Sequence, residues 1–206
     1  MKVKICGLRT EEAVLAAEDA GADFLGFIFY EKSHRHVLPE EVRDLTKHVQ
    51  HVKTVGVFVD APLDEVNAAA DFCSLDFVQL HGHESAAYAR AVCRPVIKAF
   101  RWGDDFSAEE ANDYPAEIIL LDSFSKDSVG GTGQRFRWRE AAEETARLEK
   151  PLLVAGGIAS GNVREAEEVF RPYGVDVSGS LEIEKRKFVE RIREFMAVVQ
   201  KRRIPE

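Results

Sequence analysis

The segment EIILLD at positions 117–122 sets four consecutive apolar residues between a glutamate and an aspartate. A strand that is covered on both faces reads as such an unbroken apolar run, because both sets of alternating side chains pack against other parts of the protein. The segment therefore predicts a strand of a parallel sheet, with Asp122 at its carboxyl end. A lone aspartate there can be a turn residue or a helix cap as readily as a functional group, so its meaning depends on the other strands.

Seven further segments share this apolar character and are predicted to be strands. They are rich in Val, Ile, Leu and Phe with little strict alternation, and they are VKIC (3–6), DFLGFIF (23–29), KTVGVFV (53–59), DFVQLH (76–81), PVIKAF (95–100), PLLVAG (151–156) and VDVS (175–178). Amphipathic segments that predict helices lie between them, at 10–20, 39–50, 62–73, 84–93, 107–113, 138–149, 160–171 and 185–203. Several begin with residues typical of helix starts, such as Thr10, Pro39, Pro62 and Ser107.

Strand and helix alternate eight times in 206 residues, roughly one unit per 26 residues, and no linker rich in Pro, Gly or Ser interrupts them. The alternation predicts a single α/β domain over residues 1–206, a (β/α)₈ TIM barrel near the small end of that fold's size range. An open, doubly wound sheet is the alternative architecture. In a barrel the carboxyl ends of all the strands meet on one face, where catalytic groups lie.

The chain is acidic overall, with 28 Lys and Arg residues against 36 Asp and Glu residues and a formal net charge of −8. A general nucleic-acid-binding protein shows a basic face, so this balance argues against nucleic acid as a partner. The three cysteines, Cys6, Cys73 and Cys93, form no CxxC motif and no disulfide framework, which favours a reducing compartment. The N-terminal segment lacks an apolar signal core and no apolar run is long enough to span a membrane, so we expect a cytoplasmic protein without a membrane partner. A monomer and a homodimer both fit the sequence.

Polar residues and glycines stand at the ends of the predicted strands. In chain order they are Cys6, Asp60, His81, Arg101, Asp122, the pair Gly156 and Gly157, and the run from Ser178 to Ser180, with Arg35 in the loop after the second strand. Each has an ordinary structural reading alone: a buried thiol, a turn former, a core histidine or a solvated arginine. Together they are hard to explain by packing, and they predict a site at the barrel mouth.

Two glycine-bearing loops predict where this site binds an anion. AGGI (155–158) and SGS (178–180) follow the seventh and eighth predicted strands, where barrels commonly hold phosphate on backbone N–H groups. We therefore expect Gly156, Gly157, Gly179 and Ser180 to bind the phosphate of a small-molecule substrate. GGTG (130–133), in the loop after the sixth strand, matches neither a P-loop nor a dinucleotide motif and is expected to form a lid.

Eight segments resemble the phosphoribosylanthranilate isomerases of tryptophan biosynthesis, in that family's order and spacing. They are KICGL (4–8), FIFYEKSHR (27–35), VGVFV (55–59), VQLHGHE (78–84), LLDS (120–123), GGTG with Phe136 and Trp138 behind it, VAGGI (154–158) with Asn162, and GVDVS (174–178). The resemblance implies a (β/α)₈ barrel with no metal or organic cofactor. It also implies an Amadori rearrangement of N-(5′-phosphoribosyl)anthranilate to the 1-deoxyribulose 5-phosphate derivative. By motif it implies Cys6 as general base, Asp122 as general acid and Arg35 as the residue that meets the anthranilate carboxylate.

The sequence departs from this family at three places. The eighth strand's loop reads SGSLE (178–182) where Ser-Ser-Gly-Val-Glu is common, and IEKRKF (183–188) replaces a common Gly-x-Lys-Asp. His34 stands where proline is usual. The first two departures concern the phosphate-binding loop, and none involves Cys6 or Asp122.

The chemistry requires that both reacting groups be tuned by their surroundings. A free aspartic acid has a pKa of about 3.9, so an acid at neutral pH needs burial that favours its protonated form. A free thiol is only a few per cent ionised at neutral pH, so a base at Cys6 needs backbone dipoles or a nearby cation. The sequence does not choose between these two. We expect Gly7 to leave room for the substrate beside the thiol, and His81 to contact it.

Other readings are less well supported. His34 and His36 flank Arg35, but without a third ligand at suitable spacing they do not predict a metal site. A related sugar-phosphate isomerase barrel, that of histidine biosynthesis, resembles two fused half-barrels with an aspartate base on its first strand, and Cys6 argues against it. A barrel that only binds a phosphorylated ligand is the alternative of a different class.

Overall fold

The protein was analysed as a computed structural model, which describes residues 1–103, 106–122 and 133–201. Eight parallel strands follow one another around a closed barrel, and the last pairs with the first. They are β1 (Lys2–Cys6), β2 (Phe24–Ile28), β3 (Lys53–Phe58), β4 (Phe77–Leu80), β5 (Val96–Arg101), β6 (Ile118–Asp122), β7 (Leu152–Ala155) and β8 (Gly174–Val177). The predicted (β/α)₈ barrel is confirmed, and the open sheet is excluded because β8 pairs with β1.

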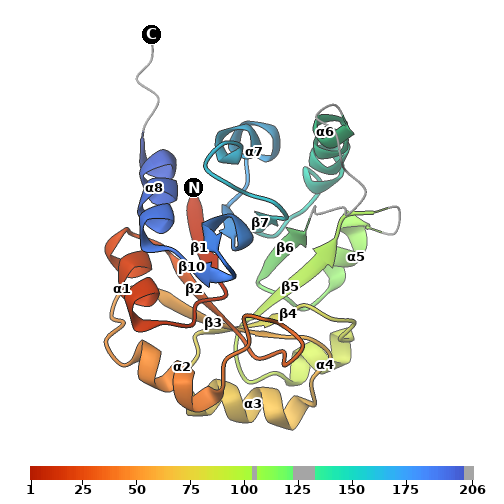
Figure 1. Ribbon diagram of the computed structural model, residues 1–206. Helices are drawn as coiled ribbons and strands as arrows, with labels where there is room; N and C mark the ends of the chain where they lie inside the picture. Colours follow the sequence, from red (N-terminus) through yellow and green to blue (C-terminus); the bar gives the residue numbers. More distant parts are fainter. Residues whose placement is uncertain (104–105, 123–132, 202–206) are drawn as a thin grey trace.

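A helix follows each strand and packs on the outside of the barrel, as Figure 1 shows. The helices are α1 (Glu11–Asp19), α2 (Pro39–Thr46), α3 (Leu63–Phe72), α4 (Ala86–Ala91), α5 (Ala108–Asp113), α6 (Gly133–Thr145), α7 (Val163–Phe170) and α8 (Val189–Gln200). Predicted starts at Thr10 and Ser107 are borne out by capping, because their hydroxyls accept hydrogen bonds from the N–H groups of Ala13 and Glu110. No helix among the described residues combines the length and apolar character that crossing a membrane requires.

The last predicted helix begins later than the sequence indicates. Positions 185–188 were assigned to the last helix, but α8 begins at Val189. A short 3₁₀ helix η1 (Gly179–Leu181) and a hairpin of β9 (Glu182–Ile183) and β10 (Arg186–Lys187) precede it. The two turn residues, Glu184 and Lys185, both have positive φ angles, of 48° and 63°. Tight hairpin turns require this backbone, which an α-helix cannot contain.

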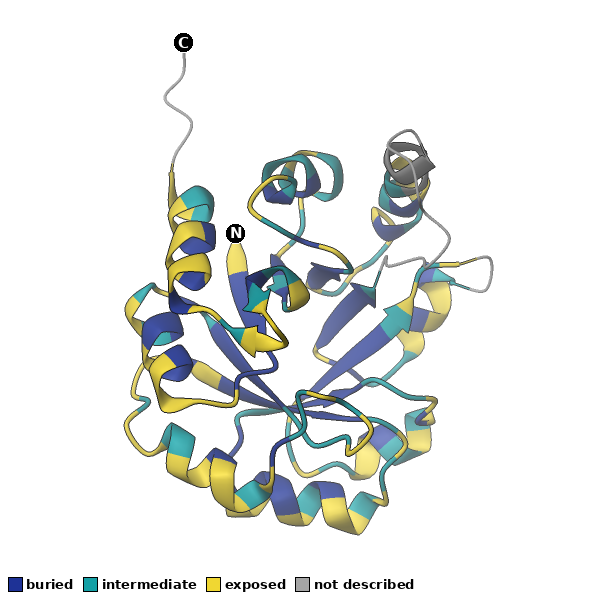
Figure 2. Cartoon of the chain, viewed as in Figure 1, coloured by how far each residue is buried: buried dark blue, intermediate teal, exposed yellow. Residues whose placement is uncertain are grey.

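The strands are buried on both faces, as their apolar runs predicted. In β6, Ile118 and Leu120 belong to a cluster inside the barrel, whereas Ile119 and Leu121 pack with the surrounding helices. Figure 2 shows the strands buried and the outer faces of the helices exposed. Because side chains alternate along a strand, Asp122 lies on the inner face, in line with Leu120.

Candidate active site

A cavity of about 550 Å³ opens at the carboxyl ends of the strands. It is lined by the eight residues predicted for the site, namely Cys6, Arg35, His81, Asp122, Gly156, Gly157, Gly179 and Ser180. These residues come from six strand–loop units that are far apart in the chain, and closure of the barrel brings them together. Gln79 and Asp176, which the sequence analysis did not single out, line the same cavity.

Cys6 is the last residue of β1 and is 5% exposed. Its carbonyl accepts a hydrogen bond from the hydroxyl of Ser178 at 2.9 Å, which ties the end of β1 to the loop after β8. Burial raises the pKa of the thiol, and the nearby ammonium of Lys4 acts in the opposite direction. Burial therefore disfavours the thiolate, and the nearby ammonium groups of Lys4 and Lys187 favour it.

Asp122 and His81 face each other across the cavity. The imidazole Nε2 of His81 lies 3.8 Å from the carboxylate Oδ2 of Asp122. The amide nitrogen of Gln79 lies 2.8 Å from Nδ1 of the same ring. Gln79 therefore holds the Nδ1 side of the ring, and Nε2 faces Asp122. Gln79 is 1% exposed, and its side-chain oxygen has no hydrogen-bond partner within the described part of the chain.

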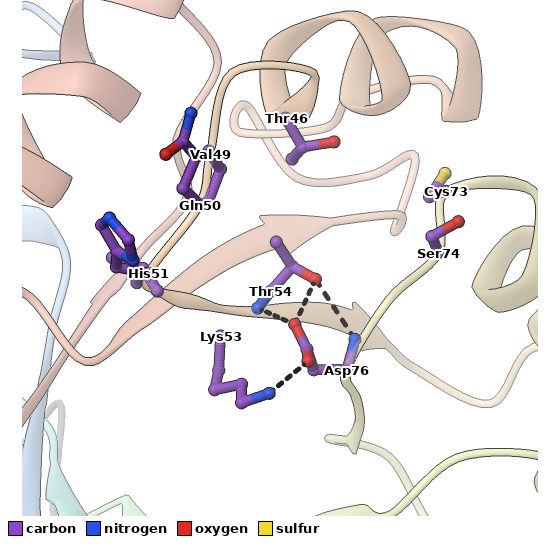
Figure 3. Close-up of a pocket in the computed structure, with 10 residues that line it drawn as sticks. Thr46, Val49, Gln50, His51, Lys53, Thr54, Cys73, Ser74 and Asp76 are labelled. Atoms are coloured by element: carbon purple, nitrogen blue, oxygen red, sulfur yellow. Dashed lines mark hydrogen bonds and ion pairs between the residues drawn. The ribbon is translucent and has the colours of Figure 1, made fainter.

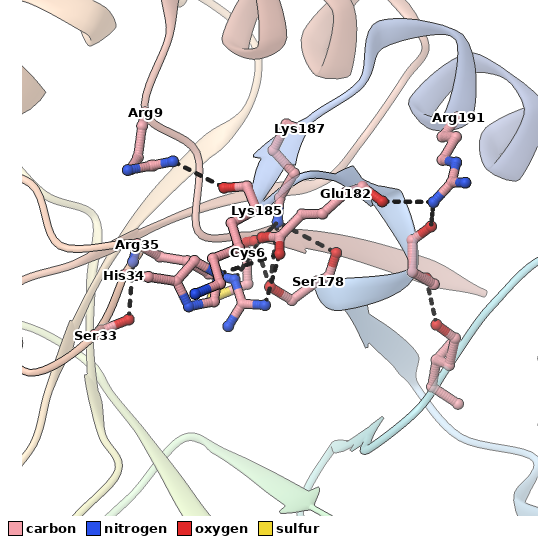
Figure 4. A network of polar contacts seen from close by, with 12 residues as sticks. Cys6, Arg9, Ser33, His34, Arg35, Ser178, Glu182, Lys185, Lys187 and Arg191 are labelled. Carbon is pink, nitrogen blue, oxygen red and sulfur yellow. Dashed lines mark hydrogen bonds and ion pairs between the residues drawn. The ribbon is translucent and has the colours of Figure 1, made fainter.

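Arg35 makes a two-point contact with Glu182, which follows η1 (Figure 4). Its Nε lies 2.5 Å from one carboxylate oxygen of Glu182 and its Nη2 lies 2.9 Å from the other. The ammonium of Lys187 adds a contact at 2.7 Å and the imidazole of His34 one at 3.2 Å. Burial favours the neutral acid, but the hydrogen bonds from Arg35 and Lys187 outweigh it and lower the pKa of Glu182 to about 2. The sequence analysis missed Glu182 and Lys187 because it treated their segment as part of the phosphate loop and a helix.

Gly7 has a different role from the one expected. Its φ angle is +79°, which disfavours any residue with a side chain. A Cβ atom at this position would collide with the aliphatic part of the Arg35 side chain. The space beside Gly7 is therefore taken by Arg35 rather than left for the substrate, and the expectation about Gly7 was wrong in that respect.

The loops after β7 and β8 are held together at the rim. Gly156 and Gly157 both have positive φ angles, and a Cβ at Gly157 would meet open space. The side chain of Asn162 braces this loop, accepting from Ala159 N at 2.8 Å and donating to the carbonyl of Gly157 at 2.9 Å. The hydroxyl of Ser180 donates to the carbonyl of Ile158 at 2.7 Å, which joins the two glycine loops.

Two further expectations concern the lid and a metal. Residues 130–132 of the GGTG segment lie outside the described residues, and Gly133 is the first residue of α6. Within the described ranges, no group of three or more His, Cys, Asp or Glu side chains is arranged to hold a metal ion. His34 is paired with Glu182 instead.

A second cavity, of about 300 Å³, lies at the amino-terminal ends of β3 and β4 (Figure 3). Its carboxylate, Asp76, accepts hydrogen bonds from the backbone and hydroxyl of Thr54 and from the ammonium of Lys53. These bonds tie the start of β3 to the start of β4. This end of a barrel contributes to stability rather than to chemistry, so the first cavity is the candidate active site.

Known proteins resemble this chain over nearly its whole length. A protein-family model described as N-(5′phosphoribosyl)anthranilate (PRA) isomerase matches residues 3–198. A relative from Geobacter sp. (strain M21), named N-(5′-phosphoribosyl)anthranilate isomerase, is 46% identical over 202 residues and covers 97% of this chain and 98% of its own.

Solved structures give the same result. The phosphoribosyl anthranilate isomerase of Thermus thermophilus superposes with a TM-score of 0.85 at 35% identity, covering 97% of this chain and 98% of its own. A phosphoribosyl anthranilate isomerase in complex with reduced 1-(o-carboxyphenylamino)-1-deoxyribulose 5-phosphate superposes with a TM-score of 0.85 at 33% identity and the same coverage.

Proposed function

The chain belongs to the N-(5′-phosphoribosyl)anthranilate isomerase family, and from this premise we propose its reaction and the residues that perform it. The protein converts N-(5′-phosphoribosyl)anthranilate to 1-(2-carboxyphenylamino)-1-deoxyribulose 5-phosphate in tryptophan biosynthesis. The observation that carries the assignment of residues is that Cys6 and Asp122 line one cavity with the glycine loops and Arg35.

Asp122 acts as the general acid. It gives its proton to the ring oxygen of the ribose, the bond from that oxygen to C1′ breaks, and the nitrogen lone pair forms a Schiff base with C1′. The position of Asp122, on the inner face at the carboxyl end of β6 and half-buried, supports this role. The imidazole of His81 lies 3.8 Å from the same carboxyl group and can stabilise the carboxylate left after proton transfer.

Cys6 acts as the general base. Its thiolate takes the proton from C2′, the C2′–H electron pair forms the C1′–C2′ double bond, and the electrons of the Schiff base return to nitrogen. The resulting enolamine tautomerises to the ketone product. Every atom and electron stays within the substrate apart from the two protons exchanged with the enzyme, so the reaction demands no redox cofactor.

The two ends of the substrate bind on different sides of the cavity. The phosphate binds at Gly156, Gly157, Gly179 and Ser180, where open backbone at Gly157 supports close approach of an anion. The carboxylate binds Arg35, whose planar fork suits a carboxylate. Glu182 takes two of the N–H donors of Arg35, and within the described ranges the structure gives the remaining donors no acceptor. Holding both ends fixes C1′ and C2′ between acid and base.

The loss of substrate fluorescence tests this function. We expect turnover by the wild-type protein and a fall in kcat of about 10²–10⁴-fold for Cys6→Ser and for Asp122→Asn, because each removes one proton-transfer group. Cys93→Ser is the matched control, since Cys93 is an exposed thiol and should leave kcat unchanged. Near-wild-type turnover in either variant would overturn the role given to that residue. Phosphate binding without any turnover by the wild type would identify a non-catalytic barrel.

A further inference from the structure

Lys4 is a charged residue with no exposed surface, and the mechanism above does not use it. It lies in β1, where its side chain points into the barrel on the same face as Cys6. An ammonium group taken out of water is costly unless it is paired and hydrogen-bonded. Its ion-pair partner is Asp176 of β8, whose Oδ1 lies 3.0 Å from the Lys4 Nζ and which lines the catalytic cavity. The pair therefore lies directly beneath the site.

The ammonium of Lys4 and the thiol of Cys6 converge on the same point. Cys6 stands opposite Gly26 of β2 in the sheet register. A Cβ atom built on Gly26 would lie 2.8 Å from the Cys6 Sγ and 3.0 Å from the Lys4 Nζ. The φ angle of Gly26 is not positive, so the backbone conformation does not require glycine at this position. The missing side chain instead leaves room for the Cys6 and Lys4 side chains. That space brings thiol and ammonium together.

We propose that Lys4, held in place by Asp176, is a positioning residue that supplies the counter-charge of the Cys6 thiolate and so sets how much of the general base is ready to react. The inference rests on the proposed function of Cys6. It answers the question that the sequence left open, whether a cation or backbone dipoles favour the thiolate.

Charges on every side of Cys6 bear on its ionisation. Burial raises the pKa of the thiol most strongly; Lys4 lowers it, Asp176 raises it, and Lys187 of β10 lowers it. Lys187 is itself bound to Glu182, which also holds Arg35. Asp122 and His81 line the cavity from β6 and from the end of β4. On the remaining side β2 presents Gly26, which carries no charge. Lys4 is the strongest of the cationic influences on the thiol.

The pH dependence of alkylation of Cys6 tests the inference. The full-length wild type and Lys4→Met are treated with iodoacetamide over a range of pH, and the extent at each cysteine is measured by peptide mass spectrometry. We expect the midpoint for Cys6 to rise by at least about one pH unit in Lys4→Met, a fall of about tenfold in the rate at neutral pH. The exposed Cys93 is the internal reference and should not change.

Asp176→Asn gives the control of opposite sign. Removing the negative charge near the thiol should lower the Cys6 midpoint, whereas removing the positive charge of Lys4 raises it. A purely structural role for the pair predicts that both variants loosen the barrel and shift Cys6 in the same direction. If Lys4→Met does not fold, Lys4→Gln, which removes the positive charge but can still hydrogen-bond to Asp176, carries the test alone, and an unchanged or lowered midpoint in it overturns the proposal. An unchanged or lowered midpoint in Lys4→Met also overturns it.

Kinetics separate this inference from the proposed function. In Lys4→Met the acidic limb of the kcat–pH profile should shift to higher pH, by about as much as the alkylation midpoint of Cys6. Activity should recover at high pH. If Cys6→Ser retains wild-type turnover, the base role fails while an effect of Lys4 on the thiol can still stand. Cys6 can prove essential for turnover while Lys4→Met changes neither the alkylation midpoint of Cys6 nor the acidic limb of the kcat–pH profile. In that case the role of Lys4 is wrong and the base role of Cys6 stands.

Discussion

Glu182 determines the position of Arg35 at the rim of the cavity. Its carboxylate binds Arg35, from the loop after β2, and Lys187, from β10. The pKa of Glu182 is lowered to about 2, because hydrogen bonds from these two cations outweigh its burial. The group is therefore ionised in the folded protein at neutral pH. In the proposed binding mode, a substrate carboxylate shares Arg35 with Glu182 or displaces Glu182 from it.

Glu182→Gln should reduce stability in a pH-dependent way. The folded-state pKa lies below the ordinary value of 4.5, so the ionised group stabilises the fold fully above about pH 4.5, and this contribution is lost as the pH falls toward 2. We expect Glu182→Gln to lower the free energy of unfolding by roughly 2 kcal/mol near neutral pH and by progressively less below pH 4.5. Urea unfolding at several pH values measures this. Glu184→Gln, an exposed carboxylate on the same hairpin, is the control. A difference that stayed constant down to pH 2 would contradict the expectation.

Residues at strand ends were predictable, and their charged partners were not. Cys6 and Asp122 could be assigned to one cavity because each ends an apolar run, and the ends of parallel strands meet in a barrel. Lys4 sits in a strand that read as ordinary, and its burial depends on Asp176, 172 positions later. Such pairings depend on the closed three-dimensional sheet, which a local pattern does not contain.

At the level of elements, a buried ion pair supports the loop that carries His81. The carboxylate of Glu84 accepts from the backbone N–H groups of Asp60 and Gly82 and from the ammonium of Lys98 at 2.8 Å. Lys98 also donates to the carbonyl of Gly82 at 2.7 Å. The side chains of Glu84 and Lys98 are 2% and 5% exposed. The network joins β5 to the loops after β3 and β4 and so positions His81, the first residue of the loop after β4.

Breaking this pair should cost more than breaking an exposed one. Glu84→Gln leaves the Lys98 ammonium buried without a counter-charge, and we expect a loss of about 3–5 kcal/mol in the free energy of unfolding. The double variant Glu84→Gln with Lys98→Met should lose less, because no buried charge remains. Lys53→Met is the matched control, because the side chains of Lys53 and its partner Asp76 are 60% and 31% exposed. The loss in the free energy of unfolding should be about 1 kcal/mol or less. Urea denaturation compares them. Equal losses in Glu84→Gln and Lys53→Met would show that burial of the pair does not matter.

Elements with clear periodicity were predicted well, and the segment after β8 was not. Apolar runs and caps located the strands and most helix starts, because both depend on neighbouring residues alone. The hairpin at 182–187 has no strong strand pattern, and its turn depends on two residues with positive φ angles that are neither glycine nor asparagine. The hairpin is stabilised by contacts with residues outside the segment. Glu182 binds Arg35, and Lys187, which also binds Glu182, donates to Ser178.

At the scale of the whole molecule, the alternation of strands and helices could not predict whether the sheet closes into a barrel. Strand–helix units build an open sheet as readily as a barrel, and the difference is whether the last strand pairs with the first. Here Lys2 pairs with Gly174, and the register continues to Ile5 and Val177. The hydroxyl of Ser178 then bonds to the Cys6 carbonyl across the same junction. Closure therefore places the thiol of the first strand beside the glycine loop of the last.

Gly174 permits this closure, and Gly174→Ala should weaken the whole barrel. A Cβ at this position would lie 2.6 Å from the carbonyl oxygen of Lys2 and 2.8 Å from the Cδ2 of Leu153. Because one of these atoms is backbone, β8 must move away from β1, and we expect a loss of roughly 1–3 kcal/mol in the free energy of unfolding.

The matched control is Gly161→Ala, where a Cβ would meet nothing within 4 Å and stability should stay within about 0.5 kcal/mol of the wild type. Urea unfolding followed by circular dichroism measures both variants. Turnover measured in the same samples should be lost at the same urea concentration as the fold, since the junction of β1 and β8 holds both the barrel and Cys6, the proposed base. Loss of turnover well before unfolding in Gly174→Ala would mean that the junction opens locally, and equal stability of the two variants would mean that β8 tolerates the added methyl group without moving.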